Sequence, residues 1–287
     1  MLKNAARLSA LFLFAHAVSS CIAVGVAAKG HSKTPDAKVR DLHFTEQKRL
    51  MATLYNHCAA EYRAIAYQAY NLAKLRIDQL KVQFPHKKHR AVVVDIDETL
   101  LDNAPYEAQS ILCDKAYPAC WDSWMNAATA KAIPGAVSFL HYVKSNGFEI
   151  FYVSNRRDKY LNQTVENLKR RGFPNADTAH VLLRTAQSPA NPNPSSKESR
   201  RAYIEKSGYE IALLLGDNLG DFYEDAQTPA GRRRLMEAHR SEFGKRFIVL
   251  PNAMYGNWVQ AIHADDDTSA KALLNAMTSN WQADCSK

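Results

Sequence analysis

Apolar residues recur along this 287-residue chain in two patterns, one helical and one typical of strands. From Glu46 to Phe84 they repeat at helical intervals, which predicts a long helical segment. Thr45 is suited to cap its start, and Pro85 ends it. Farther along, short apolar runs predict strands near 91–96, 148–153, 180–184, 210–216 and 246–250.

The segments between these strands have the pattern of helices. They lie near 134–145, 158–171 and 198–207. Pro134 fits a first helical position, and a glycine follows each helix, at Gly147, Gly172 and Gly208. Alternation of this kind specifies a mostly parallel sheet flanked by helices on both faces, so the predicted fold class is α/β.

Residues 104–132 interrupt the alternation between the first strand and the next helix. This stretch carries Tyr106, Trp121, Trp124 and two closely spaced cysteines. We interpret it as an inserted cap over the carboxyl edge of the sheet, where ligands bind in open α/β proteins.

The N-terminus has the features of a targeting segment, with a positive start at Lys3 and Arg7 and an apolar core over 8–18. Two cleavage sites compete. Cleavage after Ala28 would remove residues 1–28 and release a soluble protein, whereas a loose lipobox would end the signal at residue 20 and lipidate Cys21. Either alternative predicts an exported protein, periplasmic or anchored in the outer membrane. Nothing after residue 28 is long and apolar enough to span a membrane.

The mature chain divides into three predicted parts. Residues 29–85 form an exposed leader and an N-terminal helical segment that contributes to the cap. Residues 86–263 form the α/β core with its insertion, and residues 264–287 form a C-terminal helical segment.

Four cysteines remain after either cleavage: Cys58, Cys113, Cys120 and Cys285. An even number in an oxidising compartment favours two disulfides, for which three pairings exist. The short spacing favours Cys113 with Cys120, which leaves Cys58 for Cys285. Buried free thiols are the alternative for both pairs.

The formal charge is +8, and it falls to +6 once residues 1–28 are removed. A basic chain favours anionic partners, but there is no stripe of Arg and Lys interleaved with aromatics, so a nucleic acid polymer is not expected. Phosphorylated small molecules fit this charge, and so does a surface of solvated lysines.

The most informative run is Ala91-Val-Val-Val-Asp95-Ile-Asp97, an apolar strand that ends in two aspartates. Side chains two residues apart leave a strand on the same face. Two carboxylates side by side are costly unless a cation lies between them, which indicates a divalent metal. A calcium loop would need Gly at position 100 and Glu at position 106, where this chain has Leu100 and Tyr106.

Other predicted strand ends supply complementary groups. Ser154 and Asn155 follow the second strand, Asp217 and Asp221 follow the fourth, and Lys197 precedes the helix near 198–207. Taken singly they fit a turn serine, helix-capping acids and a surface lysine. Gathered at one sheet edge, they provide the nucleophile, metal ligands, hydrogen-bond donors and cation that phosphoryl chemistry requires.

Four motifs carry a resemblance to a known family. They are Asp95-Ile-Asp-Glu-Thr-Leu-Leu-Asp-Asn, Ile133-Pro-Gly-Ala-Val, Val153-Ser-Asn-Arg and Gly216-Asp-Asn-Leu-Gly-Asp-Phe. From about residue 45 to about 262 the chain resembles the bacterial class C nonspecific acid phosphatases of the haloacid dehalogenase (HAD) superfamily, which include outer-membrane lipoprotein 5′-nucleotidases. The resemblance implies a Rossmann-like HAD core with a small, mainly helical cap.

The resemblance also implies roles for the aspartates. Asp95 would be the nucleophile that forms an aspartyl-phosphate, and Asp97 the acid that protonates the leaving oxygen. Mg²⁺ would be held by the carboxylates of Asp95 and Asp217 and the backbone carbonyl of Asp97. Asp221 would either support the metal shell or orient Lys197.

Substrate contacts follow from the same resemblance. Ser154 and Lys197 would hold phosphoryl oxygens, with Asn155 beside them, and Trp121 and Tyr255 would stack on a nucleobase. The expected activity is a Mg²⁺-dependent hydrolysis of phosphomonoesters, including nucleoside 5′-monophosphates. The alternatives are a phosphotransferase on the same scaffold and a non-catalytic surface lipoprotein that binds a partner.

Overall fold

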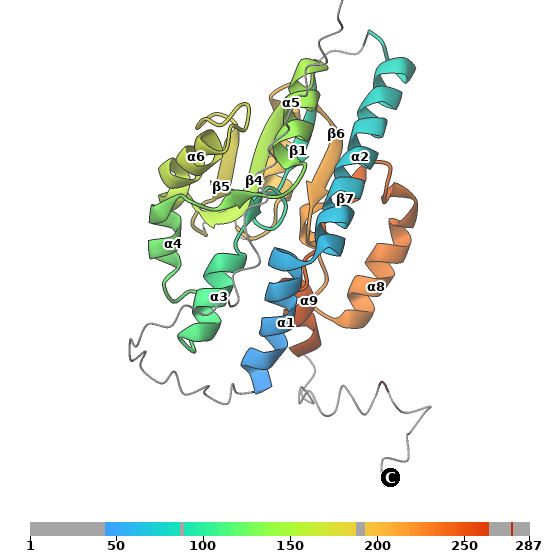
Figure 1. Cartoon of the computed structure of the whole chain (residues 1–287). Helices are drawn as coiled ribbons and strands as arrows, with labels where there is room; N and C mark the ends of the chain where they lie inside the picture. Colours follow the sequence, from blue (N-terminus) through green and yellow to red (C-terminus); the bar gives the residue numbers. More distant parts are fainter. Residues whose placement is uncertain (1–43, 87–88, 188–192, 264–276, 278–287) are drawn as a thin grey trace, which may run out of the picture. The chain divides into compact units, whose positions relative to one another are not determined.

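The computed structural model describes residues 44–86, 89–187, 193–263 and 277 (Figure 1). The predicted signal peptide, its two cleavage sites, the leader before residue 44 and nearly all of the predicted C-terminal segment lie outside these ranges. Within them, no helix combines the length and the apolar character needed to cross a bilayer.

A five-stranded sheet forms the centre of the fold, and every pair of neighbouring strands is parallel. Along the sheet the order is β5-β4-β1-β6-β7. The strands are β1 (Arg90–Val94), β4 (Glu149–Arg157), β5 (Val181–Arg184), β6 (Glu210–Gly216) and β7 (Phe247–Val249). This confirms the predicted α/β fold class, with β1 shorter and β4 longer at its carboxyl end than the sequence predicted.

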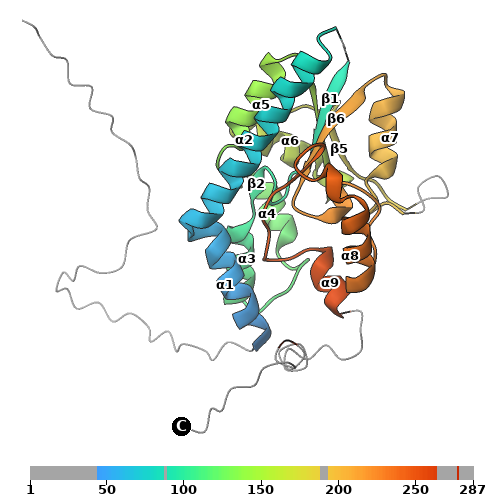
Figure 2. The same cartoon turned by 90° about the vertical axis from the view of Figure 1, so that its right-hand side faces the viewer.

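Helices cover both faces of the sheet, as Figure 2 shows. They are α2 (Ala60–Gln83), α5 (Ala136–Ser145) and α6 (Leu161–Arg170) on one face, with α7 (Glu198–Lys206) and α8 (Pro229–Ala238) on the other. Successive side chains of β1 point to opposite faces of the sheet and so enter both layers of the core. Val92 and Val94 enter the core under α2 and α5, whereas Ala91 and Val93 enter the core under α7. The central strand is therefore buried on both sides.

The N-terminal helical segment is two helices rather than one. It divides into α1 (Phe44–Cys58) and α2, separated by Ala59 in an extended conformation (φ −71°, ψ 133°). The prediction of one continuous helix was wrong because each half packs on a different partner: α1 against α3 (Ala104–Leu112) and α2 against α5. Thr45 falls inside α1 instead of capping it.

The start of α5 also differs from the prediction. Pro134 lies before the helix, and Gly135 takes the position that precedes its first residue with φ +91°. A Cβ at Gly135 would lie 2.9 Å from a ring carbon of Tyr70, so the close approach of α2 and the positive φ both favour glycine there. The predicted stops at Gly147, Gly172 and Gly208 are confirmed, since each adopts a positive φ after its helix.

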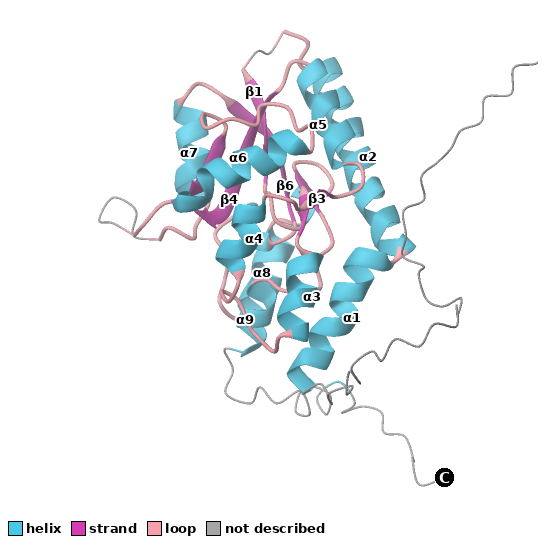
Figure 3. Cartoon of the chain, turned by 60° about the vertical axis from the view of Figure 1, so that its left-hand side comes forward, coloured by secondary structure: helices cyan, strands magenta, loops and turns pink. Residues whose placement is uncertain are grey.

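The insertion leaves and rejoins the core at one place. Strand β2 (Leu101–Asp102) pairs antiparallel with β3 (Lys131–Ala132), and α3 and α4 (Trp121–Ala127) lie between them in the chain. Figure 3 shows α1, α3, α4 and α9 (Asn257–His263) gathered beyond the carboxyl ends of the strands.

The favoured disulfide within the insertion is not formed. Cys113 and Cys120 are exposed free thiols. The Sγ of Cys113 accepts a hydrogen bond from Gln109 Nε2 at 2.9 Å, while Cys120 has a left-handed backbone (φ +59°) ahead of α4. The two residues thus belong to the ends of two separate helices. The predicted partner of Cys58, Cys285, lies outside the described residues.

Candidate active site

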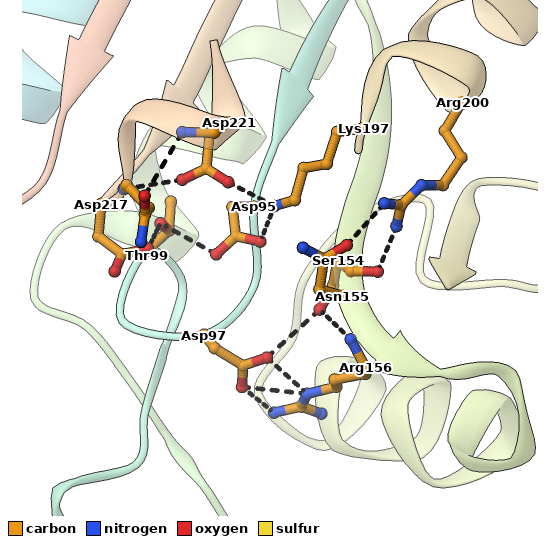
Figure 4. A network of polar contacts seen from close by, with 12 residues as sticks. Asp95, Asp97, Thr99, Ser154, Asn155, Arg156, Lys197, Arg200, Asp217 and Asp221 are labelled. Carbon is orange, nitrogen blue, oxygen red and sulfur yellow. Dashed lines mark hydrogen bonds and ion pairs between the residues drawn. The ribbon is translucent and has the colours of Figure 1, made fainter. Parts of the chain in front are cut away.

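Polar side chains converge at the carboxyl edge of the three central strands, where parallel strand ends meet (Figure 4). Asp95 and Asp97 follow β1, Ser154 lies near the end of β4, and Asp217 follows β6. Lys197 directly precedes α7 and reaches the same point. The structure therefore brings together five predicted residues that come from three strand ends and the start of one helix.

Lys197 bridges two buried acids. Its Nζ forms an ion pair with Asp95 Oδ1 and lies 2.6 Å from Asp221 Oδ1. All three side chains are at most 8% exposed. Burial alone would lower the pKa of Lys197, but the two carboxylates outweigh it and raise the pKa, so the ammonium stays charged. A permanent cation thus lies against the predicted nucleophile.

Asp221 owes its position to a glycine. A Cβ at Gly216 would lie 2.2 Å from Asp221 Oδ2, so only a residue without a side chain leaves room for this carboxylate. Asp221 Oδ2 accepts a hydrogen bond from the backbone N–H of Asn218 at 2.9 Å, and Arg201 Nη1 donates to the Asp221 backbone carbonyl at 2.9 Å. Asp221 thus contacts Lys197 directly and also lies next to Asp95 and Asp217, so its position fits both of the roles predicted for it.

Asp95, Asp217 and Asp221 form an acidic cluster with one carboxylate oxygen from each within 4.8 Å of the others. Burial raises the pKa of Asp95 to about 7 although Lys197 opposes the shift. Burial, then Asp221 and Asp95, raise the pKa of Asp217 well above its usual range. Lys197 pairs with only two of the three acids, so full ionisation of the cluster would leave excess negative charge unless a further cation were bound. An all-oxygen donor set of this kind fits a divalent cation.

Two further side chains support this cluster. Asn252 Nδ2 donates to Asp217 Oδ2 at 2.8 Å. The Thr99 hydroxyl lies between the acids, 3.4 Å from Asp95 Oδ2 and 3.3 Å from Asp217 Oδ1. These contacts favour one side-chain orientation for Asp95 and for Asp217 before any ligand binds.

Asp97 faces away from the cluster and toward β4. Arg156 Nη2 donates to its Oδ1 at 2.8 Å, and Arg156 Nε lies 3.1 Å from both oxygens. Asn103 Nδ2 donates to Oδ1 at 2.8 Å, and the Ser154 hydroxyl lies 3.3 Å from Oδ2. Burial would raise the pKa of Asp97, but Arg156 and then Asn103 outweigh it and lower the pKa. Here the Asp97 carboxylate is ionised and held from two sides.

The two residues at the end of β4 differ in exposure. Ser154 is 1% exposed, and its Oγ accepts a hydrogen bond from the Arg156 amide at 3.1 Å. Asn155 is exposed, and both ends of its amide already have protein partners. Its Nδ2 donates to the Ser195 carbonyl at 3.0 Å, and its Oδ1 accepts from Arg200 Nη2 at 2.6 Å. The predicted substrate contact of Asn155 competes with these bonds.

The aromatic residues predicted to bind a base lie in two separate segments. Trp121 packs edge-on against Tyr106 and Tyr117, with ring centroids 4.8 and 5.6 Å apart. This is a cluster within the cap itself. Tyr255 is half-buried in the loop after β7, three residues beyond Asn252.

Sequence reasoning did not assign Thr99, Asn103 or Asn252 to this site, and it also missed Arg156, Arg200 and Trp124. Arg156 was detectable, since it lies two positions after Ser154 on the same strand and so points to the same face. Arg200, in the first turn of α7, donates from Nη1 to the Ser154 carbonyl at 2.5 Å. Trp124 Nε1 donates to Asn103 Oδ1 at 2.7 Å. Neither of these two contacts has a signal in the sequence.

A family model described as HAD superfamily, subfamily IIIB (Acid phosphatase), matches residues 18–258. The solved class C acid phosphatase from Bacillus anthracis is 37% identical, with a TM-score of 0.71, and the match covers 83% of this chain and 98% of that one. The same enzyme with tungstate bound gives a TM-score of 0.72 at 37% identity, covering 84% and 98%.

Curated plant proteins match over a shorter stretch. The stem 28 kDa glycoprotein of Glycine max is 30% identical over 57% of this chain, and acid phosphatase 1 of Solanum lycopersicum is 27% identical over 57%. The match spans 58% and 57% of their respective lengths. Because the family model extends over most of the chain, the protein belongs to subfamily IIIB of the HAD superfamily, the acid phosphatases.

Proposed function

We propose that this chain is an exported, Mg²⁺-dependent acid phosphatase that hydrolyses phosphomonoesters through an aspartyl-phosphate on Asp95. One observation carries the proposal. The Asp95 carboxylate is buried at a sheet edge, paired with Lys197 and adjacent to two further acids. A carboxylate that is desolvated yet compensated in this way can approach a phosphate dianion.

The first step forms a bond between an Asp95 carboxylate oxygen and phosphorus while the ester P–O bond breaks. Lys197 and the Ser154 hydroxyl stabilise the charge on the phosphoryl oxygens. Asp97 gives a proton to the departing oxygen. The Asp97 carboxylate is ionised against Arg156 in this structure, so it must first loosen that contact, after which burial favours its protonated form.

The second step returns the enzyme to its starting state. Asp97, now ionised, takes a proton from a water molecule as that water attacks phosphorus. The bond between Asp95 and phosphorus breaks, and inorganic phosphate leaves. One carboxyl group thus serves as acid and then as base, which accounts for the need to place it beside the nucleophile and not within the acidic cluster.

The metal would be held by the carboxylates of Asp95 and Asp217 and by the backbone carbonyl of Asp97, with Asp221 close by. Support comes from the oxygen-only donor set, and from the burial and neighbouring acids that raise the pKa of Asp217 and that a bound cation would counter. When bound, Mg²⁺ would offset the repulsion between the nucleophile and the phosphate.

Nucleoside 5′-monophosphates are the proposed substrate class, with the base near Trp121 and Tyr255. Support comes from the cluster of Tyr106, Tyr117 and Trp121 in the cap, whose helices α3 and α4 lie beyond the carboxyl ends of the strands. The proposal of export rests on the N-terminal sequence pattern alone. The exported protein would be either cleaved after Ala28 or lipidated on Cys21. The intact mass of the exported protein distinguishes a lipidated from a cleaved N-terminus.

Hydrolysis of 4-nitrophenyl phosphate, with and without Mg²⁺, tests the proposal. Asp95→Asn keeps the size of the side chain and is expected to reduce turnover by several orders of magnitude. Asp78→Asn, at an exposed position of α2, is the matched control and is expected to keep full activity. Near-normal turnover by folded Asp95→Asn protein, or full activity after thorough chelation, contradicts the mechanism.

The same assay separates the alternatives. No turnover by the wild-type chain with any phosphomonoester would favour a binding protein. Preferential transfer of phosphate to an added alcohol over water would favour a phosphotransferase. The two products, inorganic phosphate and the alkyl phosphate, are measured side by side.

A further inference from the structure

The indole of Trp124, in the cap, is hydrogen-bonded to Asn103, which in turn donates a hydrogen bond to Asp97. Trp124 lies in α4, is half-buried, and donates its Nε1–H to Asn103 Oδ1 at 2.7 Å. Asn103 is completely buried at the point where the insertion begins. The contact therefore joins the middle of the cap to the loop that carries the first two aspartates.

Every polar group of the Asn103 side chain is occupied. Its Nδ2 donates to Asp97 Oδ1 at 2.8 Å and to Glu98 Oε2 at 3.1 Å. Its Oδ1 accepts the indole proton. The orientation of the amide follows from these partners, since a reversed amide would set its oxygen against two carboxylates and its nitrogen against an N–H donor.

Glu98 fixes Asn103 from the opposite side. Its Oε1 accepts the Asn103 backbone N–H at 2.7 Å, and its side chain is 1% exposed. The backbone of Glu98 is left-handed (φ +55°), an uncommon conformation for a glutamate that the surrounding contacts must maintain. Asn103 is thus held by Glu98 at its backbone and by Trp124 at its tip.

We propose that Trp124 and Asn103 are positioning residues for Asp97, so that the cap helps to aim the group that protonates the leaving oxygen. The inference rests on the function proposed above. Arg156 holds Asp97 from the core side, and Asn103 holds it from the cap side. When Asp97 loosens its contact with Arg156, Asn103 is the partner that keeps its carboxyl group within reach of the substrate.

The consequence for catalysis depends on the leaving group. An alkoxide or unsubstituted phenoxide needs a proton as the ester bond breaks, whereas a 2,4-dinitrophenolate departs without one. Loss of the Trp124 contact should therefore slow alkyl and phenyl phosphates and spare 2,4-dinitrophenyl phosphate. A residue that only stabilises the fold would affect all substrates alike.

The test is kcat/KM of Trp124→Phe for three substrates: 2,4-dinitrophenyl phosphate, phenyl phosphate and glycerol 2-phosphate. We expect a loss of about 10-fold or more for the last two, a part of the roughly 100-fold or greater contribution of a general acid, and less than about 2-fold for the first. Trp124→Gln, which restores an N–H donor at similar reach, should recover part of the loss. Trp258→Phe, outside the cap on α9, is the control and should leave the three ratios unchanged.

Each outcome decides the question. An equal loss for all three substrates, or no loss for any, overturns the positioning role while the proposed function stands. If the wild-type chain hydrolyses none of them, the proposed function itself fails. If Trp124→Phe does not fold, Asn103→Ser carries the same expectation, because serine is too short to span from the indole to Asp97.

Discussion

The ion pair between Arg156 and Asp97 provides a sharp energetic prediction. The Arg156 side chain is 2% exposed and the Asp97 side chain 20%, and two nitrogens of the guanidinium lie within 3.1 Å of the carboxylate. Arg156→Met keeps most of the aliphatic volume and removes the charge. It leaves Asp97 largely buried with Asn103 as its strongest remaining partner.

The expected cost follows from the burial of the pair. Opposite charges about 4 Å apart attract by about 4 kcal/mol at an effective dielectric constant of about 20. Breaking a fully buried pair from one side costs about 3–5 kcal/mol, because the other charge is left uncompensated. Since a fifth of Asp97 reaches solvent, we expect Arg156→Met to lower the free energy of unfolding by about 2–4 kcal/mol.

A double-mutant cycle isolates this interaction from lost packing. Urea unfolding at pH 7 of Arg156→Met, Asp97→Asn and the double variant should give a coupling free energy of about 2 kcal/mol, because the double variant leaves neither charge alone. Arg157→Met, one residue along β4 and exposed, is the control and should change stability by less than about 0.5 kcal/mol. A coupling below about 0.5 kcal/mol would refute the reasoning.

The pH dependence adds a check of sign. In the wild type the folded pKa of Asp97 lies below its usual value of about 3.9, so its stabilising contribution is present above that pH and lost as the pH falls through the folded value. In Arg156→Met, burial is opposed only by the weaker effects of Asn103 and Lys197, so we expect the folded pKa of Asp97 to rise. The deficit of the variant should therefore shrink as the pH falls from 7 toward about 4. A constant deficit would contradict this.

Three other predictions concern neighbouring contacts. Asn252→Ala removes the donor to Asp217 and should weaken Mg²⁺ binding about 10-fold or more, measured by titration calorimetry; unchanged affinity would exclude this support. Gly216→Ala drives a Cβ into Asp221 and should lower the free energy of unfolding by about 1–3 kcal/mol, measured by urea unfolding, and an unchanged stability would contradict the clash. Arg200→Met removes the charge-assisted hydrogen bond from Arg200 to the Ser154 carbonyl and so loosens the backbone at the end of β4. The inhibition constant of inorganic phosphate should rise about 5-fold or more, and an unaltered constant would count against this role.

The sequence predicted the fold and the location of the site because both depend on regular features. Apolar runs gave five parallel strands, and parallel strands place their carboxyl ends together, which located Asp95, Ser154 and Asp217 at one edge. The break at Ala59 had no such signal, since alanine favours helix and the apolar repeat continues on both sides of it.

The partners of the site residues were harder to predict. Trp124 meets Asn103 only through the packing of α4 on the core, and Arg200 meets Ser154 only through the turn that leads into α7. Both contacts join residues with no periodic relation in sequence. The unformed bond between Cys113 and Cys120 shows the same limit, because short spacing along the chain does not ensure that two side chains face each other.

The antiparallel pair of β2 and β3 has a consequence for how this architecture diversifies. The chain enters and leaves the insertion through one short antiparallel strand pair, β2 and β3. The insertion can therefore be lengthened, shortened or exchanged in evolution while the loop of Asp95 stays intact. Such an exchange would also replace the helix that carries Trp124. Under the proposed mechanism, substrate preference and the efficiency of leaving-group protonation would therefore be inherited together.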